Sequence, residues 1–149
     1  MDVIVVGVDG SAESVAALRY ALREAQACDA TVRLVNAWHI PALAYQAAVL
    51  PESLPGDLHE EAAATLEEAL AECGDLVDGV SVQRVVREGE PGHVLVAEAE
   101  GAAQLVLGTH GRGGIGEFVL GSVSHYCCRH AHCPVTVIPH IRERDLQAH

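Results

Sequence analysis

The feature that most constrains the fold is an alternation of short apolar runs with longer helical patterns along most of the chain. The first run, residues 3–8, contains no polar residue, which is typical of a strand buried on both faces of a sheet. Ser11 then provides a helix N-cap, and residues 12–27 carry apolar side chains at helical spacing. The chain therefore begins as a strand followed by a helix.

The same alternation continues to residue 138. Strands are predicted at 31–37, 80–87, 104–108 and 134–138, and helices at 57–73, 93–100 and 121–130. Asp57 opens a sequence that resembles a capping box, and Pro91 is placed as in a first helical turn. Strands that alternate with helices form a parallel sheet with helices on both faces. We therefore expect a single α/β domain over residues 1–140, followed by a polar tail at 141–149.

A glycine-rich segment after the fourth predicted strand is the strongest functional signal. Residues 108–122 contain six glycines, and the helix predicted at 121–130 starts at their end. Glycine lets the backbone approach a ligand closely, and successive N–H groups at a helix N-terminus bind anions. In open parallel sheets, ligands bind beyond the carboxyl ends of the strands, where the strand order reverses. The loops after the first and fourth strands are thus predicted to form an oligophosphate site.

The absence of lysine excludes two other classes of protein that bind or transfer phosphate groups. All nine Lys-or-Arg positions are arginine, so a Walker A loop, which needs Gly-Lys before Ser or Thr, is not present. A phosphoaspartate receiver, by resemblance to that family, also needs a lysine after its last strand. The first strand–helix turn, Asp9-Gly10-Ser11, lacks the three spaced glycines of a dinucleotide fingerprint.

Composition excludes further classes and indicates a compartment. The formal net charge of −12 would repel a phosphate backbone, so no nucleic-acid partner is expected. No apolar run is long enough to cross a bilayer, so no membrane partner is expected either. Five cysteines without a secretory signal indicate reduced thiols and a cytoplasmic location.

Three separated motifs resemble the ATP-binding universal stress proteins. Gly108, Gly111 and the pair Gly121-Ser122 are similar to that family's Gly-x2-Gly-x9-Gly-Ser/Thr signature. Residues 6–11 resemble the family's opening, and residues 130–135 its closing helix–strand junction. The resemblance implies a doubly wound five-stranded parallel sheet in the order 3-2-1-4-5. It also implies a homodimer through the last strand, Val135–Ile138, and a role as a stress-response sensor or regulator.

The resemblance further implies an ATP site, usually with a divalent metal such as Mg²⁺. The adenosine end would be lined by Gly7, Val8 and Asp9, with Ala37 beside the adenine. Leu107, Gly108 and Thr109 would continue the site toward the ribose. The phosphates would be held by His110, Gly111, Gly121, Ser122, Val123 and Ser124. Arg112 is a further candidate because a guanidinium can bind phosphate bidentately, although a solvated loop arginine is an equal alternative.

No catalytic residues are predicted, because no general base and nucleophile are assembled near the glycine-rich loop. Any ATP hydrolysis is therefore expected to be slow. One alternative is a dimeric interaction module of the same fold that binds no nucleotide. A less favoured alternative is a metal or thiol sensor built on the last helix and its exit. Its candidate residues are His125, Cys127, Cys128, His130, His132 and Cys133. Buried cysteines that serve only as small core residues are the stronger interpretation, so no metal site is predicted.

Overall fold

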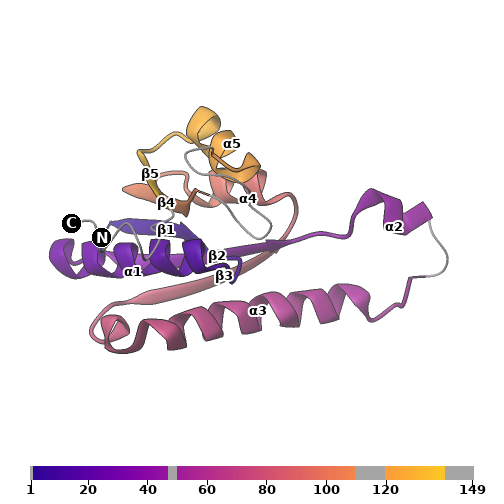
Figure 1. Cartoon of the computed structure of the whole chain (residues 1–149), viewed down its shortest axis with the longest axis horizontal. Coiled ribbons are helices and arrows are strands. Elements are labelled where there is room, and N and C mark those ends of the chain that lie inside the picture. The colour runs from indigo at the N-terminus through magenta and orange to yellow at the C-terminus, as the bar shows by residue number, and fades with distance from the viewer. Residues whose placement is uncertain (1, 47–49, 110–119, 140–149) are drawn as a thin grey trace, which may run out of the picture.

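The computed structural model describes residues 2–46, 50–109 and 120–139. Its strands form a five-stranded parallel sheet in the order β3-β2-β1-β4-β5, which confirms the expected fold (Figure 1). The strands are β1 (Val3–Gly7), β2 (Thr31–Trp38), β3 (Val82–Glu88), β4 (Gln104–Gly108) and β5 (Val135–Ile138). β1 lies between β2 and β4, so the strand order reverses there, as a doubly wound sheet requires.

Helices cover both faces of this sheet (Figure 1). The helices are α1 (Ala12–Cys28), α2 (Ala42–Gln46), α3 (Leu54–Cys73), α4 (Pro91–Glu98) and α5 (Ser122–His130), and a 3₁₀ turn η1 (Gly74–Val77) follows α3. α1 and α3 pack on one face, and α4 and α5 on the other. α2 and the first turns of α3 extend beyond the end of the sheet (Figure 1).

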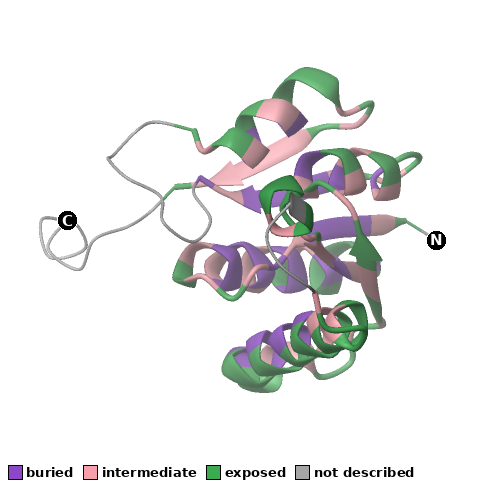
Figure 2. Cartoon of the chain, turned by 90° about the vertical axis from the view of Figure 1, so that its right-hand side faces the viewer, coloured by how far each residue is buried: buried purple, intermediate pink, exposed green. Residues whose placement is uncertain are grey.

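The central strands supply side chains to two separate apolar layers. Ile4 and Val6 of β1 pack with α1 and α3, whereas Val5 packs with α4 and α5. β4 divides in the same way, with Val106 on the first side and Leu105 on the other. This alternation follows from the period of two in a strand, and it explains why both strands are continuously apolar. Figure 2 shows the buried segments gathered on the sheet and on the helix faces turned toward it.

Most predicted ends of strands and helices agree with the structure within two residues. Two features predicted at the starts of helices are also confirmed. Ser11 caps α1, since its side chain accepts a hydrogen bond from the backbone N–H of Ser14. Pro91 is the first residue of α4, as expected. β1 ends at Gly7 rather than at residue 8, and β3 begins at Val82 rather than at residue 80.

The predicted start of the second long helix was wrong. α3 begins at Leu54 after Ser53, so Asp57 lies inside its first turn and does not cap it. Pro55 explains the difference. Its fixed φ suits the first helical turn, and its missing backbone N–H costs nothing there because the N–H groups of the first turn have no intrahelical acceptor. Asp57 still stabilises this helix end by placing a negative charge near the positive pole of the helix dipole. The connection between β2 and α3 also contains the short helix α2, which was not predicted.

Candidate functional site

A cavity of about 470 Å³ opens at the carboxyl ends of β1, β2 and β4, where the strand order reverses. Every described member of the predicted site lines it. These residues are Gly7, Val8, Asp9, Ala37, Leu107, Gly108, Thr109, Gly121, Ser122, Val123 and Ser124. The remaining predicted residues, His110, Gly111 and Arg112, lie outside the described residues. The structure thus brings together the described parts of two segments that are about a hundred residues apart in sequence.

The turn between β1 and α1 holds Asp9 in a fixed position. The Ser11 hydroxyl donates to Asp9 Oδ1 over 2.6 Å, and the Ser11 backbone N–H donates to the same oxygen over 2.9 Å. Ser14, which also lines the cavity, donates its hydroxyl to the carbonyl oxygen of Ser11 over 2.9 Å. The helix cap and the orientation of the Asp9 carboxylate therefore depend on the same serine.

The end of β4 approaches α1 so closely that only glycine fits. A Cβ atom placed on Gly108 would lie 3.0 Å from both the carbonyl carbon and the carbonyl oxygen of Glu13. These are backbone atoms, so they cannot move aside as the tip of a flexible side chain can. Gly108 is thus required for packing as well as being a candidate ligand contact.

Thr109 joins the two ends of the glycine-rich loop to the edge of the sheet. Its carbonyl oxygen accepts hydrogen bonds from the Gly121 backbone N–H at 2.7 Å and from the Ser124 hydroxyl at 2.8 Å. Its own N–H and hydroxyl both donate to the carbonyl oxygen of Ile138 in β5, each over 3.1 Å. These bonds hold the start of α5 at the cavity, where the free backbone N–H groups of the first helical turn favour an anion.

Ser122 and Ser124 have different surroundings, although both line the cavity. Ser124 is only 2% exposed, and its hydroxyl donates to backbone carbonyl oxygens. Ser122 is exposed at the first position of α5. Of the two hydroxyls, that of Ser122 is the one available to a ligand oxygen, whereas that of Ser124 holds the loop ends together.

One wall of the cavity was missed by sequence reasoning. It comes from α3, whose Leu58, Glu61, Ala62 and Thr65 line the cavity. Their spacing of three and four residues places them on one helix face, and this was the only available signal. Other lining residues that were missed are Ser14, Val35, Asn36, Trp38, His39, Pro91 and Leu95. Periodicity alone does not tell which face of a helix meets a site rather than the core.

One side-chain hydrogen bond attaches α3 to β2 at this wall, and a second lies within α3. The Asn36 amide nitrogen Nδ2 donates to the carbonyl oxygen of Ala62 over 3.3 Å, and the Thr65 hydroxyl donates to the carbonyl oxygen of Glu61 over 3.0 Å. Beside them, the indole Nε1 of Trp38 is buried and meets no acceptor within the described ranges. The Asn36 and Thr65 side chains are therefore held by backbone carbonyl oxygens of α3.

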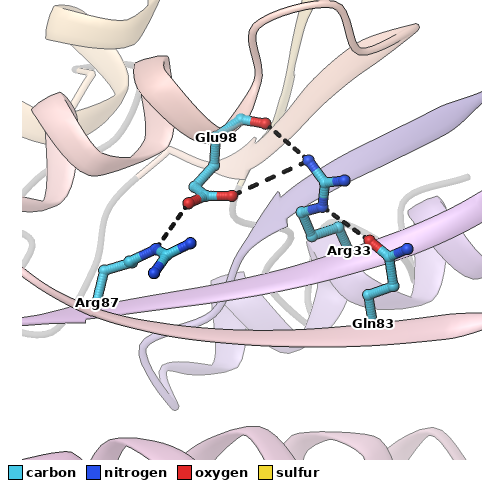
Figure 3. Close-up of polar contacts among 4 residues, drawn as sticks. All are labelled: Arg33, Gln83, Arg87 and Glu98. Atoms are coloured by element: carbon cyan, nitrogen blue, oxygen red, sulfur yellow. Dashed lines mark hydrogen bonds and ion pairs between the residues drawn. The ribbon is translucent and has the colours of Figure 1, made fainter.

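A polar network attaches α4 to the sheet (Figure 3). α4 supplies Pro91 and Leu95 to the lining of the cavity. Glu98 of α4 accepts a hydrogen bond from Arg87 Nε at 2.9 Å and lies 4.0 Å from Arg33 Nη1, which also donates to the Glu98 carbonyl oxygen. Arg33 Nε donates to Gln83 Oε1 over 2.9 Å. β2, β3 and α4 are thereby connected on one face of the sheet.

Comparison with known proteins identifies the family. The model of the universal stress protein family matches residues 1–139. The chain belongs to the universal stress protein family. Its fold and the position of its cavity at the strand-order reversal agree with that membership.

Individual members of this family are similar over nearly the whole chain. A universal stress protein of Mycolicibacterium smegmatis is 34% identical over 142 residues, covering 91% of this chain and 47% of the relative. One from Methanocaldococcus jannaschii is 32% identical over 140 residues, covering 91% of this chain and 80% of the relative. The chain thus spans about half the length of the mycobacterial relatives that it matches.

A solved structure extends the comparison to a ligand complex. A universal stress protein crystallised in complex with cAMP matches with a TM-score of 0.65 and 27% identity, covering 92% of this chain and 95% of that chain.

In the present universal stress protein, no helix in the described ranges combines the length and apolar character that a bilayer crossing requires.

The cysteine- and histidine-rich last helix does not assemble a metal site within the described residues. No group of three His, Cys, Asp or Glu side chains there is arranged to hold an ion. Burial raises the pKa of Cys127 to about 12, so its thiol stays protonated at neutral pH and is a poor nucleophile. Cys127 packs in the apolar layer of α4 and α5, which agrees with the interpretation that it is a core residue.

Proposed function

We propose that this universal stress protein binds an adenine nucleotide, ATP with Mg²⁺, in the cavity at the carboxyl edge of its sheet. The observation that carries the proposal is that every described residue of the predicted site lines this one cavity. Its volume of about 470 Å³ lies within the range of small-molecule sites. The complex of a 27% identical family member with cAMP supports an adenine nucleotide as the ligand.

The two ends of the cavity differ in chemistry, which supports one orientation of the nucleotide. The start of α5 offers backbone N–H groups and the Ser122 hydroxyl, and we assign the phosphates to this end together with His110, Gly111 and Arg112. The opposite end is walled by Ala37, Val35 and the α3 face, and we assign the adenosine to it. Gly7, Val8 and Asp9, on β1 and its turn, also line the cavity, and we assign them to the adenosine end.

The charge balance supports a requirement for Mg²⁺. Asp9 and Glu61 line the cavity, whereas none of its described lining residues is Lys or Arg. A triphosphate entering a protein of net charge −12 gains from a divalent cation that offsets its own negative charge. Mg²⁺ would be held chiefly by phosphate oxygens and water, as is usual for this ion.

The nucleotide is proposed to control the protein rather than to be consumed by it. The sequence places no paired general base and nucleophile near the glycine-rich loop, so ATP hydrolysis is expected to be slow at most. We therefore propose a cytoplasmic sensor or regulator of a stress response.

A homodimer through β5 is part of the same proposal. β5 is an edge strand, Val135–Ile138, and its side chains are only partly buried in the single chain. An apolar edge of this kind favours pairing with a copy of itself. Light scattering at micromolar concentration should give the mass of a dimer, and V137K, which puts a charge on the edge, should give a monomer. A monomeric wild-type protein would contradict this part of the proposal.

Titration calorimetry with ATP tests the central claim. Saturable binding at physiological ATP concentration is expected, with weaker binding when EDTA removes Mg²⁺. Trp38 is the single tryptophan and lines the cavity, so its fluorescence should change in the same titration. Absence of saturation, together with no nucleotide in the ultraviolet spectrum of the denatured purified protein, would favour the interaction module that binds no nucleotide.

A further inference from the structure

The two edges of the sheet carry different side chains. β5 forms one edge with four residues, none of which is charged. β3 forms the other edge with seven residues, and the polar or charged ones are Gln83, Arg84, Arg87 and Glu88. In the described ranges, β2 is the only strand that pairs with β3. The backbone N–H and C=O groups on the other side of β3 therefore form an edge to which a further strand could be added.

The centre of β3 favours such an addition. Val85 and Val86 are adjacent β-branched residues, and both are only partly buried in the single chain. β-branched residues suit a strand, and a proline-free segment of this kind at an exposed edge tends to pair with other chains. β3 also pairs with β2 along its whole length, from Val82 to Glu88, so it is a longer template than β5.

Two arginines flank this pair of valines, and each is bound to a glutamate of a helix. Arg84 Nε donates to Glu67 Oε1 of α3, and Arg87 Nε donates to Glu98 Oε1 of α4 over 2.9 Å (Figure 3). α3 and α4 lie on opposite faces of the sheet, and strand residues three apart also point to opposite faces. The two arginines therefore place a positive charge on each face of this edge.

An added strand would disturb both charged groups. The side chains of Arg84 and Arg87 are 48% and 62% exposed, so water still hydrates much of each one. Neighbouring strands of a sheet lie about 4.8 Å apart, so side chains of a new strand would displace part of this water. Removing water from a charged group is costly unless new hydrogen bonds replace it. Charged residues at an edge, on both sides of an apolar segment, thus oppose pairing.

We infer that Arg84 and Arg87 keep β3 free of added strands, so that copies of this chain do not associate through that edge. This inference goes beyond the proposed function and requires no nucleotide. Its consequence concerns the proposed dimer. Two copies that pair through β5 use the same edge of each chain, and the assembly is closed. Pairing of β5 with β3 would leave a free edge at both ends, and the assembly would extend without limit.

Replacement of both arginines by threonine tests the inference. R84T/R87T removes the two charges and keeps β-branched side chains that suit a strand. Light scattering across the micromolar range should give a mass that rises with protein concentration, to about twice the wild-type mass or more. R84K/R87K keeps both charges and should keep the wild-type mass. R23Q/R129Q is the matched control, because it removes two exposed arginines of α1 and α5 with the same change in net charge, and it should also keep the wild-type mass.

Two further measurements keep the test decisive. Circular dichroism identifies variants with the wild-type fold, and if R84T/R87T does not keep it, R84T and R87T are compared singly and should each give a smaller increase in mass. In concentrated R84T/R87T, backbone amides of residues 82–88 should exchange hydrogen more slowly than in the wild type, because they become paired.

The outcomes separate this inference from the proposed function. A wild-type mass in folded R84T/R87T would overturn the inference. An equal increase in R23Q/R129Q would also overturn it, because loss of arginine anywhere would then be sufficient. A monomeric wild-type protein would contradict only the proposed dimer, and R84T/R87T should then still exceed the mass of a monomer.

Discussion

The Ser124 hydroxyl donates a 2.8 Å hydrogen bond to the carbonyl oxygen of Thr109 and thereby connects the start of α5 to the end of β4. Because Ser124 is 2% exposed, water cannot replace this bond when it is lost. The glycine-rich loop between these two residues therefore begins and ends at points that the fold holds together.

Replacement of the two serines at the start of α5 should separate stability from binding. S124A should lower the free energy of unfolding by about 1 kcal/mol, because a buried hydrogen bond is lost. S122A should leave stability within about 0.5 kcal/mol of the wild type, as expected at an exposed position, and should weaken ATP binding. Urea denaturation and calorimetry measure the two effects. If S122A binds ATP like the wild type, the assignment of its hydroxyl to the phosphates is wrong.

Adding a methyl group at the end of β4 should destabilise the fold. In G108A, the new Cβ would lie within 3.0 Å of backbone atoms of Glu13, so β4 or α1 must shift, at a cost of about 1–3 kcal/mol. G56A is the matched control, since a Cβ there meets nothing within 4 Å in the first turns of α3. Alanine in a helix is favoured over glycine, so G56A should raise stability by up to about 1 kcal/mol. Thermal unfolding followed by circular dichroism measures both changes in stability. A G108A variant as stable as the wild type would contradict the close approach of β4 and α1.

Neutralising Glu98 should loosen α4 from the sheet. The Glu98 side chain is 17% exposed and contacts both Arg33 and Arg87, so E98Q should cost about 1 kcal/mol of stability. The cost should shrink at 1 M salt, because the pair with the more exposed Arg87 is screened. E68Q changes an exposed glutamate outside this network and should be neutral. An E98Q cost that is independent of salt would indicate a packing effect instead of a charge effect.

The thiols should differ in reactivity according to burial. Cys28 and Cys128 are exposed and should react with a thiol reagent in the native protein at pH 8, whereas Cys73 and Cys127 should react only after unfolding. Mass spectrometry of the alkylated peptides identifies the modified residues. Rapid native modification of Cys127 would revive the thiol-sensor interpretation of the last helix.

The raised pKa of Cys127 also has a consequence for stability at alkaline pH. The pKa is about 12 in the folded protein against an ordinary value of 9.0, so the unfolded chain loses this proton first. The contribution of the buried thiol to stability is therefore complete below pH 9 and decreases as the pH rises from 9 toward 12. Urea denaturation at pH 7 and pH 10 checks this. The free energy of unfolding should fall less between these two pH values in C127A than in the wild type.

Local patterns in the sequence were sufficient for the order of strands and helices, for the buried character of β1 and β4, and for the cap at Ser11. These features depend on residues close together in the chain: apolar continuity, helical spacing and a serine before a helix. The positions of the candidate site on β1 and around the glycine-rich loop were predictable for a related reason, since parallel strands must all end at one edge of the sheet. The order of the strands came from the family resemblance.

Only the tertiary structure decided what faces the cavity from other parts of the chain. In the sequence, Glu61 is one of several glutamates on an amphipathic helix. Only the packing of α3 against β2 places the helix face that carries Glu61 at the cavity. Asn36 acquires a defined orientation only through the carbonyl oxygen of Ala62, which is 26 residues away. Ser122 and Ser124 look equivalent in sequence, and the fold makes one accessible and the other structural. In each case the deciding contact joins residues that are brought together by packing, and no local periodicity encodes that contact.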